Sequence, residues 1–281
     1  MSEGRILDFT VVLGCDAKHV EKLALCWENW RRNRPTLFCR DIIIFVDSDA
    51  AAASVCDIVK PDGDRIKVVA WEPNGDWESD GSRWTDPQRQ KMLAGFVHIP
   101  ARYVHNTEYW LKLDLDVIAK TVHDDSWIKQ RWFRTNPAIV GHRWGYTKPA
   151  HQMQSLDMWV EAYGHREEMQ LLATSPPLNI RPKEEDAGAV SHPRIISWCA
   201  FFRTDFTKQC SNWAHLTSVK QVSGEYLTER SDELPVPSQD GFMWYCAQRL
   251  RQEVLRLNMK RDGQWIHKST LKGMKEALSE L

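Results

Sequence analysis

Two aspartates, Asp114 and Asp116, directly follow an apolar segment of the chain, residues 109–113. Carboxylate oxygens are the ligands that Mg²⁺ and Mn²⁺ prefer in proteins, so the pair could hold a divalent cation. We expect 109–113 to form a β-strand, and residues two positions apart on a strand point the same way. Both carboxylates would then face one ion. The alternative is that they only cap the end of the strand.

The Asp-x-Asp spacing also occurs at 47–49 and 62–64, so the context of each pair has to discriminate between them. The pair at 62–64 encloses a glycine and follows a proline, which is typical of a turn. The pair at 47–49 follows an apolar segment, 42–46. Only the pair at 114–116 has apolar residues on both sides, with 117–119 after it, and this context favours a metal site there.

The composition of the chain is that of a globular protein with a large core. It has 281 residues, of which 42% are hydrophobic, and a formal net charge of −1. Basic and acidic residues are scattered without long runs, so there is no strong signal for nucleic acid or for an anionic membrane. No apolar segment reaches the length of a membrane span, and the seven cysteines show no Cys-x-x-Cys spacing. We therefore expect a cytoplasmic protein with reduced thiols.

The first 120 residues alternate between apolar segments and segments with helical periodicity. We predict strands at 9–13, 42–46, 66–70 and 109–113, and helices at 19–34 and 88–96. Continuous apolar strands separated by helices favour an α/β fold with a mostly parallel central sheet flanked by helices. In such sheets ligands bind beyond the carboxyl ends of the strands, which is where Asp47, Asp114 and Asp116 are expected to lie.

Beyond residue 120 the order of elements changes. We predict strands at 138–141 and 194–202, and helices at 152–162 and 240–257. No repeat, low-complexity tract or convincing boundary separates these elements from the first half of the chain. Residues 1–281 are therefore expected to form a single domain.

Four features, taken in chain order, resemble the glycosyltransferases of the GT-A fold. They are the α/β first half, the Asp-x-Asp pair at 114–116, the acidic residue Asp240 that follows Gln239 at the start of a late helix, and His267 near the C-terminus. Each motif is short, and their order along the chain carries the resemblance. It implies a GT-A-like domain that transfers a sugar to an acceptor hydroxyl.

The resemblance also implies a metal and a donor. Asp114, Asp116 and His267 would hold Mn²⁺ or Mg²⁺ on the diphosphate of a UDP- or GDP-sugar, and the cation would neutralise the leaving diphosphate. Residues 1–120 would bind the nucleotide sugar and the metal. Residues 121–281 would bind an unidentified acceptor and would include a C-terminal metal-site segment. We expect that segment to have little packing of its own and to be ordered chiefly by donor and metal.

Further roles follow from the same resemblance. Asp240 corresponds to the base that deprotonates the acceptor hydroxyl in inverting members, and Lys268 could contact phosphate. Arg89 and Lys91 look like the family's basic helix before the metal strand. Each assignment has an alternative: Asp240 could only cap its helix, His267 could be a surface imidazole, and the basic pair could be a solvated helix face.

Four more residues are candidate donor contacts. Gly14 ends the first strand, Asp47 ends the second and suits a nucleobase or ribose, and Leu115 lies between the two aspartates. Trp198 could form the floor of a sugar site, because sugar rings stack on indole faces. Asp47 could equally form a turn, and Trp198 could equally pack in the core.

The sequence departs from the family pattern in two places and leaves two rival functions open. Gln239 stands where Glu is more usual, and the residues after His267 lack the glycine and lysine spacing of one retaining branch, so the stereochemical outcome is undecided. A nucleotidyltransferase that makes sugar nucleotides would carry a Gly-rich phosphate loop after the first strand, where this chain has only Gly14. The other rival is a carbohydrate- or nucleotide-binding protein without catalysis.

Overall fold

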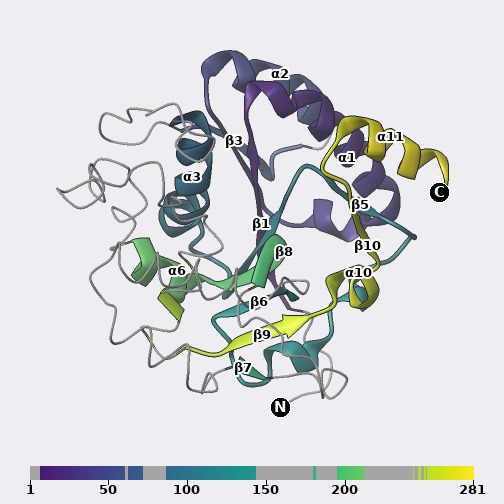
Figure 1. Cartoon of the computed structure of the whole chain (residues 1–281). Coiled ribbons are helices and arrows are strands. Elements are labelled where there is room, and N and C mark those ends of the chain that lie inside the picture. The colour runs from purple at the N-terminus through teal and green to yellow at the C-terminus, as the bar shows by residue number, and fades with distance from the viewer. Residues whose placement is uncertain are drawn as a thin grey trace, which may run out of the picture.

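The structure is a computed structural model, and it describes residues 7–60, 63–71, 87–143, 180–181, 195–211 and 252–281, together with 243, 246, 247 and 250. Within these residues the strands form a central sheet that has helices on both faces (Figure 1). The helix predicted at 152–162 lies outside the described residues.

The central sheet contains eight described strands, in the order β3-β2-β1-β4-β8-β6-β9-β7. Their bounds are Phe9–Cys15 (β1), Ile42–Val46 (β2), Ile66–Ala70 (β3), Tyr109–Leu113 (β4), Ile139–Arg143 (β6), Ile180–Arg181 (β7), Ile195–Arg203 (β8) and Val254–Leu257 (β9). β8 is antiparallel to β4 and β6, and every other described pair in this sheet is parallel. The predicted mostly parallel central sheet flanked by helices is therefore confirmed.

Two groups of helices cover the two faces of the sheet (Figure 1). One group is α1 (Val20–Asn33), α2 (Asp49–Val59) and α11 (Leu271–Ser279), and the other is α3 (Pro87–Tyr103) and α6 (Thr204–Ser211). Strand residues alternate between the two cores, so Val11 and Leu13 of β1 pack beneath α1 and Val12 packs beneath α3. Among the described helices, none is long and apolar enough to cross a membrane.

The strand order creates a topological switch point between β1 and β4. From β1 the chain builds outward through β2 to β3, and it then returns to the other side of β1 to form β4. Such a point leaves a crevice beyond the carboxyl ends of the two strands, where open α/β sheets bind ligands. In this chain Asp16 follows β1 and Asp114 follows β4, so both acidic residues lie at the crevice.

A two-stranded ribbon extends from this crevice. It consists of β5 (Val117–Ala119) and β10 (Trp265–His267), which pair antiparallel, with α10 (Met259–Asp262) before β10. The pairing sets His267 opposite Val117, and Lys268 N donates to Asp116 O at 2.9 Å. Residues 267 and 268 are thereby held beside the Asp-x-Asp turn.

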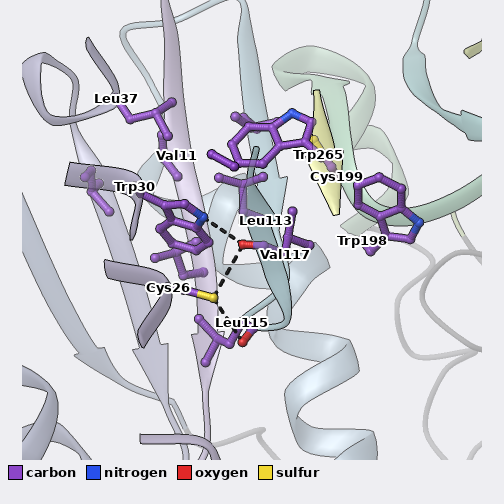
Figure 2. Packing of buried hydrophobic residues seen from close by; sticks show 14 of the residues in the cluster. Val11, Cys26, Trp30, Leu37, Leu113, Leu115, Val117, Trp198, Cys199 and Trp265 are labelled. Atoms are coloured by element: carbon purple, nitrogen blue, oxygen red, sulfur yellow. Dashed lines mark hydrogen bonds between the residues drawn. The ribbon is translucent and has the colours of Figure 1, made fainter. Parts of the chain in front are cut away.

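Side chains of α1 cover the other edge of β5 (Figure 2). Trp30 Nε1 donates to Val117 O at 2.8 Å, and the Cys26 thiol donates to Leu115 O at 3.2 Å. Buried backbone carbonyls need such partners, because an unpaired one costs about 1 to 3 kcal/mol. The short strand β5 is therefore held by a helix on one side and by β10 on the other.

Arg34, which directly follows α1, is fully buried and joins the ribbon to the core. Its guanidinium donates to Gly263 O at 3.0 Å, to Gln264 O at 3.3 Å and to Thr121 O. The guanidinium carbon also lies 4.6 Å from the centre of the Trp265 ring. Burial lowers the pKa of Arg34 to about 10, so the side chain stays charged at neutral pH. The carbonyl and ring contacts offset the cost of burying this charge.

The expectation that the C-terminal segment has little packing of its own is wrong. Trp265 and Met274 are fully buried, and Lys22 Nζ of α1 donates to Ser269 O at 2.9 Å. An ion pair between Lys275 and Glu21 adds a second link to α1. The segment carries enough apolar surface and enough hydrogen bonds to be ordered by the core itself.

Two predicted helix boundaries also change. The helix predicted at 240–257 is wrong at its end, because residues 254–257 form β9 between β6 and β7. The apolar residues there fit either a helix face or a buried strand, and pairing with β6 decides between them because it satisfies the backbone of both strands. The helix predicted at 88–96 extends to Tyr103 as α3 and contains Pro100.

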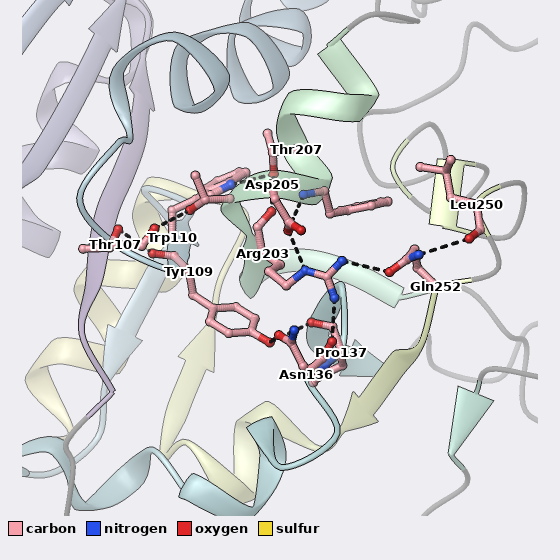
Figure 3. A network of polar contacts seen from close by, with 12 residues as sticks. Thr107, Tyr109, Trp110, Asn136, Pro137, Arg203, Asp205, Thr207, Leu250 and Gln252 are labelled. Carbon is pink, nitrogen blue, oxygen red and sulfur yellow. Dashed lines mark hydrogen bonds and ion pairs between the residues drawn. The ribbon is translucent and has the colours of Figure 1, made fainter.

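A polar network lies at the end of the central strands opposite the crevice (Figure 3). Arg203 at the end of β8 donates to Asp205 at 2.5 Å, to Asn136 O at 2.6 Å and to Gln252 Oε1 at 2.8 Å. The Tyr109 hydroxyl at the start of β4 lies 2.8 Å from Asn136 Oδ1. The network joins β4, β8 and the approach to β9, so its role is structural.

We predict that Arg34→Lys lowers the free energy of unfolding by about 2 kcal/mol, because an ammonium cannot reach the separate carbonyl acceptors that the guanidinium fork serves. Urea unfolding measures the change. Arg32→Lys is the matched control: this α1 side chain is 72% exposed, and its replacement should change stability by less than about 0.5 kcal/mol. Equal stability of the two variants would contradict the role given to Arg34.

Candidate functional site

The turn at 114–116 gives the two carboxylates different surroundings. β4 ends before residue 114, and a backbone hydrogen bond of 3.3 Å from Val117 N to Asp114 O closes the turn. The premise that Asp114 and Asp116 lie on one strand and therefore point the same way is wrong. Asp114 forms an ion pair with Lys112, whereas Asp116 faces His267 of the ribbon.

Asp116 and His267 place a carboxylate oxygen beside an imidazole nitrogen. Asp116 Oδ1 and His267 Nε2 are 3.2 Å apart, with side chains 19% and 31% exposed. Burial raises the pKa of Asp116, but the contact with His267 and the charges of Lys22 and Lys112 outweigh it and hold the pKa below its usual value. The carboxylate is therefore ionised at neutral pH. Its Oδ1 is buried, and it is the atom that faces the imidazole of His267.

These two atoms fit a divalent cation that completes its coordination shell with substrate. Mg²⁺ is commonly bound by one or two protein side chains together with substrate phosphates and water. Across the part of the chain that the structure describes, no group of three or more His, Cys, Asp or Glu side chains is arranged to hold a metal ion. The buried Asp116 Oδ1 and the facing His267 Nε2 are suitable ligands, and the third predicted ligand, Asp114, is in its ion pair with Lys112.

Lys112 is a buried cation at this site that the sequence patterns did not single out. The residue is 4% exposed, and its Nζ lies 4.4 Å from the centre of the Phe96 ring of α3. A signal was present in the sequence, because Lys112 is a charged residue within the otherwise apolar segment 109–113, two positions before Asp114. Lys112 supplies fixed positive charge at the carboxyl end of β4, where it favours an anionic ligand.

Trp198 of β8 packs against His267 at the end of β10. Its indole is 2% exposed and is stacked on the His267 ring, with centroids 5.4 Å apart and an interplanar angle of 15°. Its backbone oxygen accepts a hydrogen bond from Asp114 N at 2.9 Å. A donor sugar could stack on this indole only if the ring became exposed.

The carboxyl ends of β1 and β2 provide further polar groups. Gly14 lies in β1, and Asp47 directly after β2 accepts a hydrogen bond from Ala17 N at 3.2 Å. Asp16 Oδ1 is buried and lies 2.6 Å from His19 Nδ1, with which it forms an ion pair when the imidazole is protonated. Burial raises the pKa of Asp16, but the contact with His19 outweighs it and leaves the pKa below its usual value.

The remaining predicted residues lie in different settings. Leu115 is 6% exposed and packs in the core beneath α1, while Lys268 is exposed beside the Asp-x-Asp turn. Arg89 and Lys91 belong to α3 by backbone, and their side chains lie outside what the structure describes. Asp240 lies outside the described residues. The structure thus brings together residues of the turn, the ribbon and β8.

Comparison with known proteins places the fold. Neither a protein-family model nor a curated protein matches this sequence. The solved structure of core-mannan synthase A from Aspergillus fumigatus, in its Mn/GDP form, is similar with a TM-score of 0.54 and 11% identity over 88% of this chain and 71% of that one. The mannosyltransferase Ktr4p from S. cerevisiae in complex with GDP is similar with a TM-score of 0.51 and 11% identity over 85% and 66%. The fold is of the GT-A type, as the sequence predicted.

We predict that Asp116→Asn destabilises the protein more at neutral pH than in acid. The pKa of Asp116 is lower in the folded protein than its ordinary value of 3.8, so its ionisation stabilises the fold above that pH, and this stabilisation is lost as the pH falls through the folded-state pKa. The free energy of unfolding is measured at several pH values. Asp57→Asn, on the exposed side of α2, is the control and should give a nearly constant difference. A pH-independent effect of Asp116→Asn would contradict the lowered pKa.

Proposed function

We propose that this protein is a glycosyltransferase that moves a sugar from a nucleotide-diphosphate donor to an acceptor hydroxyl with Mn²⁺ or Mg²⁺. The observation that carries the proposal is the convergence of an ionised carboxylate and an imidazole nitrogen, Asp116 Oδ1 and His267 Nε2, 3.2 Å apart. They meet beside the switch point of a GT-A sheet, which is where such sheets bind ligands.

The charged groups around the crevice suit a diphosphate. Asp116 and His267 would hold the cation, which when bound would neutralise charge on the leaving diphosphate. Lys112 would add fixed positive charge from β4, and the exposed Lys268 is a candidate contact to phosphate. Asp47 remains our candidate for the nucleobase or ribose, because it lies at the carboxyl end of β2.

The acceptor step needs a base. We assign it to Asp240, on the sequence resemblance, with the proton passing from the acceptor hydroxyl to its carboxylate as the new glycosidic bond forms. Arg89 and Lys91, near the start of α3, remain candidate phosphate contacts. The two similar solved structures contain GDP, which supports GDP and GDP-sugars as the first probes, with UDP-sugars as the second set.

Nucleotide binding should depend on a divalent cation. At 100 times its Kd, GDP or UDP with Mn²⁺ is expected to add about 2.7 kcal/mol to the free energy of unfolding, and excess EDTA should remove most of this increment. Thermal unfolding with and without chelator measures it. Asp116→Asn should abolish the Mn²⁺-dependent part, whereas Asp57→Asn should retain it. Equal stabilisation in EDTA would exclude a cation bridge between protein and diphosphate.

Catalysis should depend on Asp240. Asp240→Asn is expected to keep Mn²⁺-dependent nucleotide binding and to lower turnover by about 10²- to 10⁴-fold, which is the usual contribution of a general base. Turnover is followed as nucleoside diphosphate released from a GDP- or UDP-sugar in the presence of a panel of acceptors. Full activity in this variant would reduce Asp240 to a helix cap. Release of pyrophosphate instead of nucleoside diphosphate would indicate a nucleotidyltransferase.

A further inference from the structure

Trp198 contacts both parts of the candidate metal site. Its indole stacks on the His267 imidazole, with centroids 5.4 Å apart and planes 15° from parallel. Its backbone oxygen accepts the hydrogen bond from Asp114 N that fixes the start of the Asp-x-Asp turn. A single residue of β8 therefore lies against the turn from the first half of the chain and the imidazole from the last strand.

The Trp198 ring is itself held by a fixed neighbour. Its centroid lies 4.9 Å from that of the His142 ring of β6, at an interplanar angle of 49°. His142 is 9% exposed, and its Nδ1 accepts a hydrogen bond from Met259 N at 3.1 Å. A ring nitrogen that accepts carries no proton, so this bond fixes both the orientation and the tautomer of His142. The indole thus packs against one immobile ring and presents its face to His267.

His267 needs such support because of its place in the chain. It ends β10, a strand of three residues, and its side chain is 31% exposed. An imidazole at such a position would sample several rotamers, and ordering it on metal binding would cost entropy. Stacking on the buried indole removes this freedom in advance and leaves Nε2 facing Asp116 Oδ1.

We propose that Trp198 is a positioning residue that orients His267 for a divalent cation. The inference rests on the proposed function, because it takes Asp116 and His267 as metal ligands. Residues that orient a metal-binding histidine typically change metal affinity by about 10- to 100-fold when they are replaced. The indole would contribute in this way while contacting neither the cation nor the donor.

The test measures Mn²⁺ alone, without nucleotide, binding to the full chain. Titration is followed by the decrease of the free Mn²⁺ signal in electron paramagnetic resonance spectra, which can be recorded for every variant, including His267→Ala. Trp198→Leu should weaken Mn²⁺ binding by about tenfold or more, and Trp198→Phe, which keeps an aromatic face, should bind more tightly than the leucine variant. Trp132→Leu removes a comparably buried indole that is 3% exposed and should bind Mn²⁺ like the parent.

A second readout needs only the parent and the conservative variant. An imidazole stacked on an indole has its ring protons shifted upfield by the aromatic ring current, so those of His267 should be shifted in the parent and less so in Trp198→Phe. If Trp198→Leu does not fold, this measurement tests whether the indole orients His267. Unshifted His267 protons in the folded parent would overturn the proposal.

The outcomes separate this proposal from the function on which it rests. If His267→Ala weakens Mn²⁺ binding but Trp198→Leu binds as tightly as the parent, the positioning role is wrong and the metal site stands. If His267→Ala binds Mn²⁺ as tightly as the parent, the metal site is wrong, and the positioning role is wrong with it.

Discussion

The pairing of β5 with β10 is the constraint on which the candidate site depends, and the buried guanidinium of Arg34 secures it. The pairing sets His267 beside Asp116, although the two residues are far apart in the sequence. Arg34 binds the carbonyls that precede β10 and lies over the Trp265 ring, so the ribbon cannot shift without leaving a buried charge unpaired. The candidate metal site is thereby preorganised by the core, and the cost of ordering its residues is met on folding rather than on binding.

The charges at the crevice are divided between two environments. On the α3 side of the sheet, Lys112 neutralises Asp114 inside the protein. At the ribbon, Asp116 stays ionised, and its buried oxygen faces His267. This division places a buried ammonium, paired with Asp114, and an ionised candidate ligand for a mobile cation at the same crevice. In the proposed function, the Lys112 ammonium and the mobile cation would both act on a diphosphate, which is the most highly charged part of a nucleotide-sugar donor.

The two ends of the central strands differ in how their polar groups are arranged. At the end opposite the crevice, Arg203 and Tyr109 donate hydrogen bonds to acceptors on several neighbouring segments. At the crevice, the buried Oδ1 atoms of Asp16 and Asp116, which follow β1 and β4, face the imidazoles of His19 and His267. Carboxylates and imidazoles that meet at a ligand crevice are candidates for binding a ligand, whereas the network at the other end of the strands contributes stability.

The sequence alone determined the α/β architecture, because continuous apolar strands such as 42–46 have to be buried on both faces of a sheet. It also pointed to Asp116 and His267 through their order in the chain. Tertiary structure decided what local patterns could not: a turn at 114–116 separates the two aspartates, and pairing with β6 makes a strand of 254–257. The roles of Lys112 and Trp198 likewise depend on contacts between segments far apart in sequence, which periodicity does not encode.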